Sequence, residues 1–321
     1  MKETETTLAK TISVAGVNAA YDNACKRILS DKNILAWIMK SCLPEYKTCS
    51  VDEIAANYIE GEPQISDIAV HQDEQKNSSR IQGMNTEDVS INEGTVTYDI
   101  RFYALAPVSG ERIRLIINVE AQNDFYPGYP VVKRNIYYCS RLISSQHGTE
   151  FEGSHYEQIK KVYSIFICME PPKYRRNTIN CYSIQEENVI GNAKEKKENY
   201  DLMTAVMLCL GVKDDEEVSG ILRLLEVLLS SERNAEEKKK ILQEEYGIEM
   251  TKKLDKEVSE MCNLSKGVEA KGIQKGIQKG IQKGILSSIQ TLMITMNWTV
   301  EQAMDALKIP KEDRTKYLEK L

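Results

Sequence analysis

The sequence predicts an α/β protein, with a mixed central sheet flanked by helices and a helical C-terminal region. Between residues 95 and 185, short runs rich in β-branched and aromatic residues lie on both sides of one segment with helical spacing. Beyond about residue 195, apolar residues recur at helical intervals with Lys and Glu between them. The 321 residues are 41% hydrophobic and 28% charged, which excludes a chain disordered throughout and suggests about two domains.

The first part of the chain predicts helices. Residues 1–30 are expected to form an N-terminal segment, of which residues 1–20 should be frayed or weakly helical. Asp31 is a suitable N-cap for an amphipathic helix, and Ser50 begins a capping box that predicts a second helix running to Gly61. The polar stretch 62–94 has few large apolar residues, so we expect a surface insertion.

The middle of the chain predicts the sheet. Two strands joined by a Ser-Gly turn should be followed by a helix and two further strands. The expected strands are 95–105, 113–122, 162–169 and 180–185, and the expected helix is 129–145.

The C-terminal half predicts helices alone, over 202–210, 218–229 and 235–261. A KGIQ repeat follows. Its glycines each weaken a helix by about 1 kcal/mol relative to Ala, which favours a solvated linker or marginal helix over a nucleic-acid contact. The tail should be a small helical unit, with apolar contacts from Trp298, Ala303, Leu307 and Leu318. The expected organisation is an N-terminal segment 1–30, a core 31–195, a helical region 196–264, the repeat 265–285 and the tail 286–321.

Charge and composition limit the function. A net charge of −6 argues against a protein that coats nucleic acid by charge alone, although residues 99–176 carry eleven Lys/Arg and eight Asp/Glu, a local net of +3. The eight cysteines show no CxxC pair and predict free thiols rather than a zinc site. His147 and His155 are interpreted as surface residues rather than general bases.

The chain offers no membrane or export signal. No run approaches the roughly 18 apolar residues of a membrane span, and the N-terminal residues have no apolar h-region. We therefore expect a cytoplasmic protein without a membrane partner.

The predicted hairpin brings acidic residues together. If Ser109 and Gly110 form its turn, paired positions sum to 219 and Asp99 faces Glu120. Strand alternation places Gln122 on the same face as Glu120. One face of this hairpin is therefore expected to be polar.

Two carboxylates directly opposite each other repel and weaken a sheet. A bound Mg²⁺ would offset that repulsion, since this ion is held by one or two carboxylates together with waters and substrate phosphates. The alternatives are hydrated acids on an exposed face, or one acid paired with Arg101 or Arg114. A bulge in either strand would shift the register by one residue.

These residues carry a resemblance to a known family. The stretch TVTYDIRFYAL…IINVEAQNDFYPGYPVVKRNIYYCSRLISSQ has Tyr98-Asp99, then twenty residues, then Glu120–Gln122. It resembles the PD-(D/E)XK nuclease superfamily and, more narrowly, the bacterial recombination-promoting nuclease (Rpn-like) and transposase family. The resemblance extends over roughly residues 30–285 and includes the KGIQ repeat.

The resemblance implies a restriction-endonuclease-like core with Mg²⁺-dependent DNA cleavage. Asp99 and Glu120 would be metal ligands, and an acid from the N-terminal helices, Glu60, would complete the metal shell. The third signature position usually holds Lys but here is Gln122, which can orient a water molecule and cannot supply a cation. The Glu120-Ala121-Gln122 sequence resembles the Glu-x-Gln form of this signature in the narrower family.

The helix after the hairpin predicts a DNA contact. Lys133 or Arg134 would bring positive charge to the site. Arg134, Tyr137 and Arg141 share one helix face, and Arg with Tyr makes a suitable phosphate-contacting surface. The alternative is that the tyrosines pack against the sheet while the arginines are solvated.

The sequence thus predicts a Mg²⁺-dependent DNA endonuclease acting on mobile or recombining DNA. One alternative is a catalytically inactive DNA-binding or interaction protein on a decayed nuclease fold. Another is an assembly module built from the C-terminal helices. A homo-oligomer, in the simplest case a dimer, is compatible with the first hypothesis, since nucleases that cut both strands are often dimers.

Overall fold

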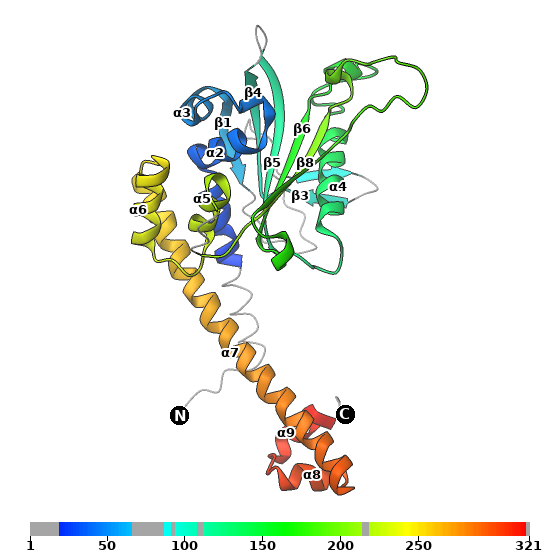
Figure 1. Ribbon diagram of the computed structural model, residues 1–321, viewed down its shortest axis with the longest axis vertical. Coiled ribbons are helices and arrows are strands. Elements are labelled where there is room, and N and C mark those ends of the chain that lie inside the picture. The colour runs from blue at the N-terminus through cyan, green and yellow to red at the C-terminus, as the bar shows by residue number, and fades with distance from the viewer. Residues whose placement is uncertain (1–18, 66–86, 91–93, 108–111, 214–217, 319–321) are drawn as a thin grey trace. The chain divides into compact units, whose positions relative to one another are not determined.

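The computed structural model describes residues 19–65, 87–90, 94–107, 112–213 and 218–318 (Figure 1). The chain divides into two compact units. One unit is Ala15–Leu264, and the described part of the other lies within Ser265–Leu321.

The described N-terminal part of the chain is helical and packed. A helix covers residues 19–29 and buries Cys25 and Ile28 completely. Most of the segment 1–20, expected to be frayed or weakly helical, lies outside the described residues. The next helix, α2 (Lys32–Cys42), begins at the predicted N-cap, because the Asp31 carboxylate accepts a hydrogen bond from the Asn33 N–H at 2.9 Å.

The second predicted helix is shorter than expected. Ser50 caps α3 (Val51–Glu53) as predicted, accepting from the Glu53 N–H at 3.1 Å. The chain continues through the π-helical turn η2 (Ile54–Tyr58) and then enters strand β1 (Ile59–Ile65). Part of the predicted insertion 62–94 is therefore strand.

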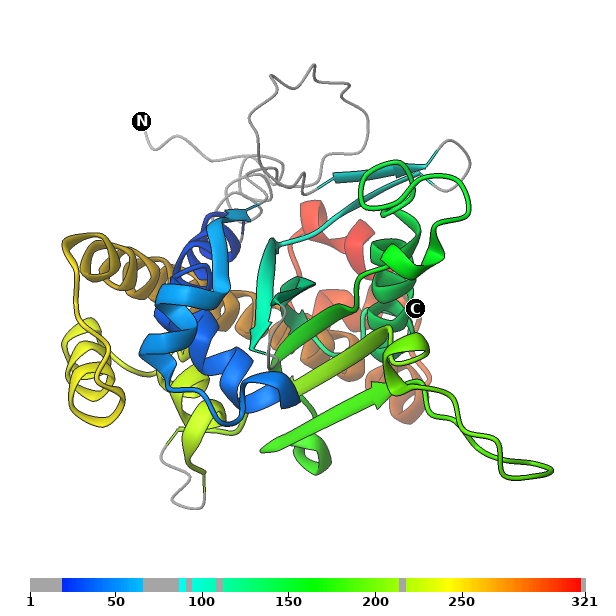
Figure 2. The ribbon, with the colours of Figure 1, turned by 90° about the horizontal axis from the view of Figure 1, so that it is seen from above.

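The main sheet has six strands in the order β1-β4-β5-β6-β8-β7, and all its neighbours are antiparallel except β5–β6 and β6–β8 (Figure 2). A separate two-stranded sheet pairs β2 (Glu87–Ser90) with β3 (Gly94–Thr97). The remaining strands are β4 (Ile100–Pro107), β5 (Arg112–Asp124), β6 (Val162–Glu170), β7 (Thr178–Ser183) and β8 (Met203–Cys209).

The hairpin has the predicted register. Ile100 pairs with Val119 and Arg101 with Asn118, so paired positions sum to 219. The expected single strand 95–105 is instead interrupted, because the chain bends at residues 98–99 between β3 and β4. The turn residues themselves lie outside the described residues.

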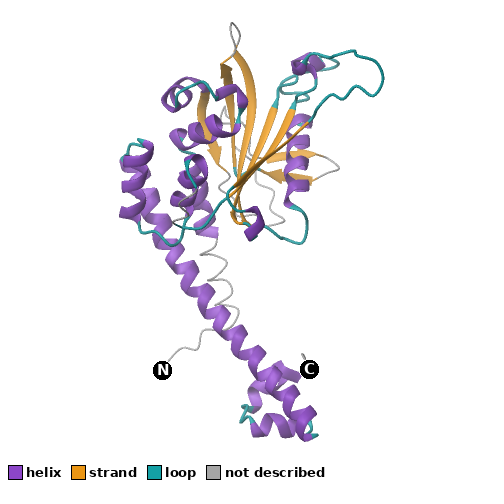
Figure 3. Ribbon diagram, viewed as in Figure 1, coloured by secondary structure: helices purple, strands orange, loops and turns teal. Residues whose placement is uncertain are grey.

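Different layers cover the two faces of the sheet. Helix α4 (Val131–Ser144) connects the parallel strands β5 and β6 and packs on one face of the sheet (Figure 3). On this face the ring centroids of Tyr138 and Phe166 lie 5.6 Å apart in an edge-on arrangement. On the other face, alternate strand residues such as Ile165 and Ile167 join one apolar core with α2 and α5 (Gly220–Leu229). The face toward α2 and α5 is thus mainly apolar, with the buried Thr204 of β8 as a polar exception, while Glu120 and Gln122 lie on the α4 side.

Strand β8 corrects the prediction of a helix over 202–210. Its sequence MTAVMLC is continuously apolar, and a short apolar run does not distinguish a strand from a buried helix. Pairing with β6 on one side and β7 on the other makes it an internal strand. The sheet core consequently extends beyond the expected boundary at residue 195.

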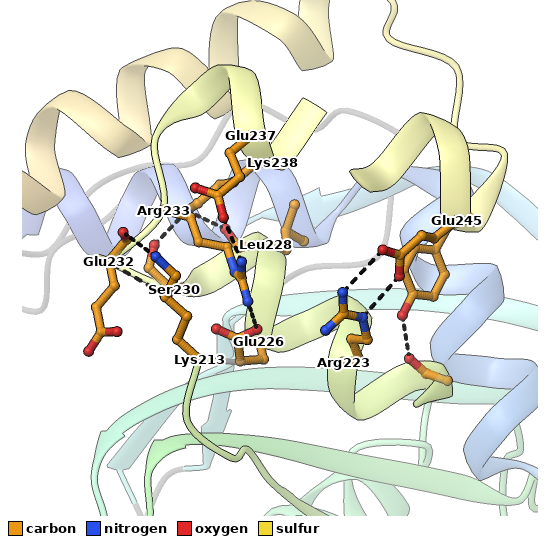
Figure 4. A network of polar contacts seen from close by, with 12 residues as sticks. Lys213, Arg223, Glu226, Leu228, Ser230, Glu232, Arg233, Glu237, Lys238 and Glu245 are labelled. Carbon is orange, nitrogen blue, oxygen red and sulfur yellow. Dashed lines mark hydrogen bonds and ion pairs between the residues drawn. The ribbon is translucent and has the colours of Figure 1, made fainter. Parts of the chain in front are cut away.

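A buried polar network holds the helices that follow the sheet (Figure 4). Arg233 contacts Glu226 at 3.2 Å and Glu237 at 2.6 Å. The fully buried Lys238 of α6 (Ala235–Tyr246) donates to the carbonyls of Leu228 and Ser230, at 2.9 and 2.6 Å. These bonds satisfy carbonyls that the C-terminal end of α5 leaves without intrahelical partners.

The C-terminal unit contains the end of α7 (Lys252–Met296), α8 (Val300–Ala306) and α9 (Lys311–Leu318). The KGIQ repeat lies within α7, so the backbone there is helical. The apolar cluster of this unit includes the predicted Ala303 together with Ile289 and Met304, whereas Leu307 and Leu318 are exposed.

The cysteines in the described part of the chain, all eight, are free thiols, as predicted. Within the same part, no helix has both the length and the apolar character that a membrane crossing requires.

The internal position of β6 predicts the effect of truncating its side chains. Ile167→Ala should lower the free energy of unfolding by about 2–5 kcal/mol, because Ile167 is completely buried at the centre of the sheet. Urea denaturation in a Trp298→Phe background, with Trp37 as the fluorescent reporter of this unit, measures the loss. The matched control is Ile179→Ala on the edge strand β7, where the side chain is 37% exposed and the loss should stay below about 1 kcal/mol. Equal losses at the two positions would contradict the described sheet order.

Candidate functional site

Two acidic residues meet where β4 begins. Asp99 lies in the bend just before β4. Glu120 lies on the neighbouring strand β5, one residue beyond Val119, which pairs with Ile100. Glu120 pairs with Phe166 of β6, and Gln122, two residues farther on, pairs with Cys168. The β4–β5 ladder begins at the Ile100–Val119 pair, so Asp99 and Glu120 are adjacent at its end and are not a ladder pair.

Backbone hydrogen bonds hold these carboxylates. The Asp99 N–H donates to Glu120 Oε1 at 2.9 Å, and the Ala121 N–H donates to Asp99 Oδ2 at 3.0 Å. Glu120 is 4% exposed, and the Asp99 side chain is 16% exposed. This reciprocal arrangement requires the bend at residue 99, because the turned backbone directs its N–H toward the neighbouring strand.

The structure brings an unpredicted cation to the pair. Lys26, on the helix over residues 19–29, places Nζ 2.9 Å from Asp99 Oδ1 and 2.8 Å from Asp22 Oδ2. Burial raises the pKa of Asp99, and the Lys26 ammonium opposes that rise. Burial would lower the pKa of Lys26, but Asp99 and Asp22 outweigh it and raise the pKa, so the ammonium stays charged.

Sequence reasoning missed Lys26 because it lies 73 positions before Asp99, in the N-terminal segment outside the expected core 31–195. The available signal was its i,i+4 spacing from Asp22, which marks a polar stripe on an otherwise apolar helix. Such a stripe is usually solvated, so it does not by itself predict a contact with a strand.

A second cation reaches the site from α4. Arg134 donates to Gln122 Oε1 at 2.5 Å and to the Tyr129 hydroxyl at 3.0 Å. Its guanidinium also lies over the Phe166 ring, 5.0 Å from the centroid. Burial disfavours its charge, yet the bond to Tyr129 and the nearby Glu120 carboxylate outweigh this effect and raise the pKa of Arg134. Of the two predicted cations, Arg134 contacts the site and Lys133 is exposed.

Glu60 is not brought to this pair. It lies on strand β1 rather than on a helix, opposite Tyr103 of β4. Tyr103 is four residues along the chain from Asp99, about 13 Å of strand. The prediction that Glu60 completes a metal shell is therefore not supported by its position, since the π-helical turn ends before it and β1 takes its own register.

The predicted DNA-contacting face of α4 is only partly exposed. Tyr137 is 43% exposed, but Arg141 is 2% exposed and donates to the Tyr137 hydroxyl at 3.1 Å. Tyr138 packs against the sheet. The helix thus combines both alternatives, since Tyr138 packs against the sheet and Tyr137 lies at the surface. Arg141 is too deeply buried to contact a phosphate at the surface.

The donor set suits Mg²⁺ better than a transition metal. Asp99 and Glu120 supply carboxylate oxygens and Gln122 an amide oxygen, and Mg²⁺ requires only one or two carboxylates with waters and substrate oxygens. Across the described ranges, no group of three or more His, Cys, Asp or Glu side chains is arranged to hold a metal ion. These residues therefore form no closed protein cage, and what the structure shows is two adjacent carboxylates.

Comparison of the chain with protein-family models, with curated proteins and with solved structures gave no significant match.

The pairing of Lys26 with Asp99 predicts strong energetic coupling. Lys26→Met should lower the free energy of unfolding by about 3 kcal/mol, because it leaves a buried carboxylate without its cation. In an Asp99→Asn background the same substitution should cost at least about 1 kcal/mol less. Urea denaturation of the wild type, both single variants and the double variant measures this coupling. Additive losses would show that the two side chains do not interact.

Proposed function

We propose that this protein is a Mg²⁺-dependent DNA endonuclease. The observation that carries the proposal is the pair of largely buried carboxylates, Asp99 and Glu120, locked together by backbone hydrogen bonds at the start of β4. Two acids side by side destabilise a sheet unless their charge is compensated, here by Lys26 and backbone N–H groups and, when it is bound, by a cation. Open dicarboxylate sites are typical of magnesium-dependent phosphoryl chemistry.

The roles follow from the positions of the side chains. Asp99 and Glu120 would hold Mg²⁺, which when bound polarises a phosphodiester and lowers the pKa of a bound water. Lys26 keeps a positive charge beside Asp99 and limits the repulsion between the acids and a phosphodiester anion. Gln122, oriented by Arg134, offers an amide group to position a water molecule. The resemblance to recombination-promoting nucleases supports a substrate in mobile or recombining DNA.

The contact between Arg134 and Gln122 explains why a lysine at position 122 would not suit this site. Gln122→Lys should lower the free energy of unfolding by about 1–3 kcal/mol, because it replaces a hydrogen-bond acceptor with a second cation facing a half-buried guanidinium. Gln122→Met, which removes the acceptor without adding charge, should cost less. Adding Arg134→Gln should restore stability to Gln122→Lys if charge repulsion is the cause. Thermal or urea unfolding of these variants measures each effect, and no recovery in the double variant would rule out repulsion.

Cleavage of supercoiled plasmid tests the proposed function directly. Wild type should nick or linearise the plasmid with Mg²⁺ and lose that activity in EDTA. Asp99→Asn and Glu120→Gln keep the shape of each side chain and remove its charge, so each should lower cleavage at least about a hundredfold. Glu60→Gln is the matched control and should retain near wild-type cleavage, because Glu60 lies outside the pair. Cleavage that survives in Asp99→Asn would show that the site is wrongly assigned or that the preparation contains a contaminating nuclease.

A catalytically inactive DNA-binding protein is the second candidate. Both oxygens of Asp99 already accept hydrogen bonds, from Lys26 and from the Ala121 N–H, which is the arrangement expected of an acid retained for structure. This candidate predicts that plasmid is retarded on a gel and remains uncut with Mg²⁺, Mn²⁺ or any other divalent ion. That outcome would replace the endonuclease proposal.

A further inference from the structure

Exposed tyrosines gather beyond the strand ends that carry the candidate site. Tyr126 and Tyr129 follow β5, and Tyr174 follows β6; their exposed fractions are 64%, 46% and 72%. We call these three residues the tyrosine rim. Single exposed aromatic side chains are common, whereas a group of them at one place on the surface marks an interaction site.

Hydrogen bonds link the rim residues to one another and to the candidate site in two places. The Tyr126 and Tyr174 hydroxyls lie 3.2 Å apart, which links the segment after β5 to the segment after β6. The Tyr129 hydroxyl accepts from Arg134, and Arg134 in turn donates to Gln122. A molecule resting on the rim would therefore lie next to Gln122 and the carboxylate pair.

Positive charge surrounds the rim. The segments 125–134 (FYPGYPVVKR) and 171–176 (PPKYRR) together contain five Lys/Arg and no Asp/Glu. Lys133, Lys173 and Arg176 are exposed, and the Arg175 guanidinium lies 5.8 Å from the centroid of the Tyr174 ring. Glu170, at the end of β6, is an exposed acid beside them. The surface as a whole is cationic, although the protein carries a net charge of −6.

Exposed aromatic rings among cations match a specific class of nucleic acid. Unpaired bases stack on tyrosine rings while the neighbouring phosphates contact Lys and Arg, and this pattern is typical of single-strand binding surfaces. Bases within a duplex are already stacked on one another and offer only their edges. The rim is thus suited to unpaired bases rather than to continuous double helix.

We propose that the tyrosine rim binds unpaired nucleotides and delivers single-stranded or strand-separated DNA to the site of Asp99 and Glu120. This inference rests on the proposed endonuclease function, because it names the substrate class of that site. It assigns stacking to Tyr126 and Tyr174 and phosphate contacts to Lys173 and Arg176.

Fluorescence anisotropy in EDTA tests the inference without requiring cleavage. The probes are fluorescein-labelled (dT)20 and a hairpin duplex with the same number of nucleotides. Wild type should bind (dT)20 more tightly than the hairpin. Tyr126→Ala/Tyr174→Ala should weaken (dT)20 binding at least about tenfold and hairpin binding less than about threefold. Tyr126→Phe/Tyr174→Phe keeps the rings and loses the hydroxyl contact, so its affinity for (dT)20 should stay within about threefold of wild type.

Two further variants separate stacking from other causes. Tyr156→Ala is the matched control, because Tyr156 is 65% exposed but lies in η3 (Tyr156–Gln158) before β6, at the other end of that strand from Tyr174. It should bind both probes like wild type. Lys173→Ala/Arg176→Ala should weaken both probes and reduce the dependence of binding on salt.

The outcomes distinguish this inference from the endonuclease proposal. Ring-dependent binding of (dT)20 by a protein that never cuts DNA would retain the binding surface and overturn the nuclease. Metal-dependent cutting by a protein whose (dT)20 affinity is unchanged in Tyr126→Ala/Tyr174→Ala would retain the nuclease and overturn the inference. Tighter binding of the hairpin than of (dT)20 by wild type would also overturn it.

Discussion

The structure depends on the compensation of two buried acids, Asp99 and Glu120. Their charge is met by the backbone N–H groups of residues 99 and 121 and by the ammonium of Lys26. Removing one partner from a buried ion pair costs several kcal/mol. The hairpin register, the bend before β4 and the docking of the helix over residues 19–29 are therefore linked, since a shift in any of them would leave a carboxylate without a donor.

This constraint divides the sheet into two unlike faces. On the α2 side, most inward positions of the central strands are apolar, and the packing there supplies stability without involving the site. On the α4 side, Glu120 and Gln122 lie between aromatic residues, and Arg134 covers them from the helix. Aromatic packing fixes the Arg134 guanidinium on α4, so Gln122 is held in place by a rigid helix.

The local charge of the site differs from that of the whole protein. A net charge of −6 repels a polyanion at long range, but salt screens such repulsion over about 10 Å. Within that distance of the strand ends, the cations after β5 and β6 dominate. Under the proposed function, nucleic acid would therefore contact this local cationic surface, and the protein would not coat DNA along its length.

The sequence alone determined what depends on local pattern. Strand alternation and a Ser-Gly turn were enough to predict the register that sets Asp99 beside Glu120, and side-chain caps were enough to predict where α2 and α3 begin. Only the tertiary structure decided which segments far apart in the chain meet. In the tertiary structure β8 lies inside the sheet, Glu60 pairs with Tyr103 instead of joining Asp99 and Glu120, and Lys26 contacts Asp99. The reason is physical, since burial and pairing partners are properties of the assembled core and are not encoded in the periodicity of any single segment.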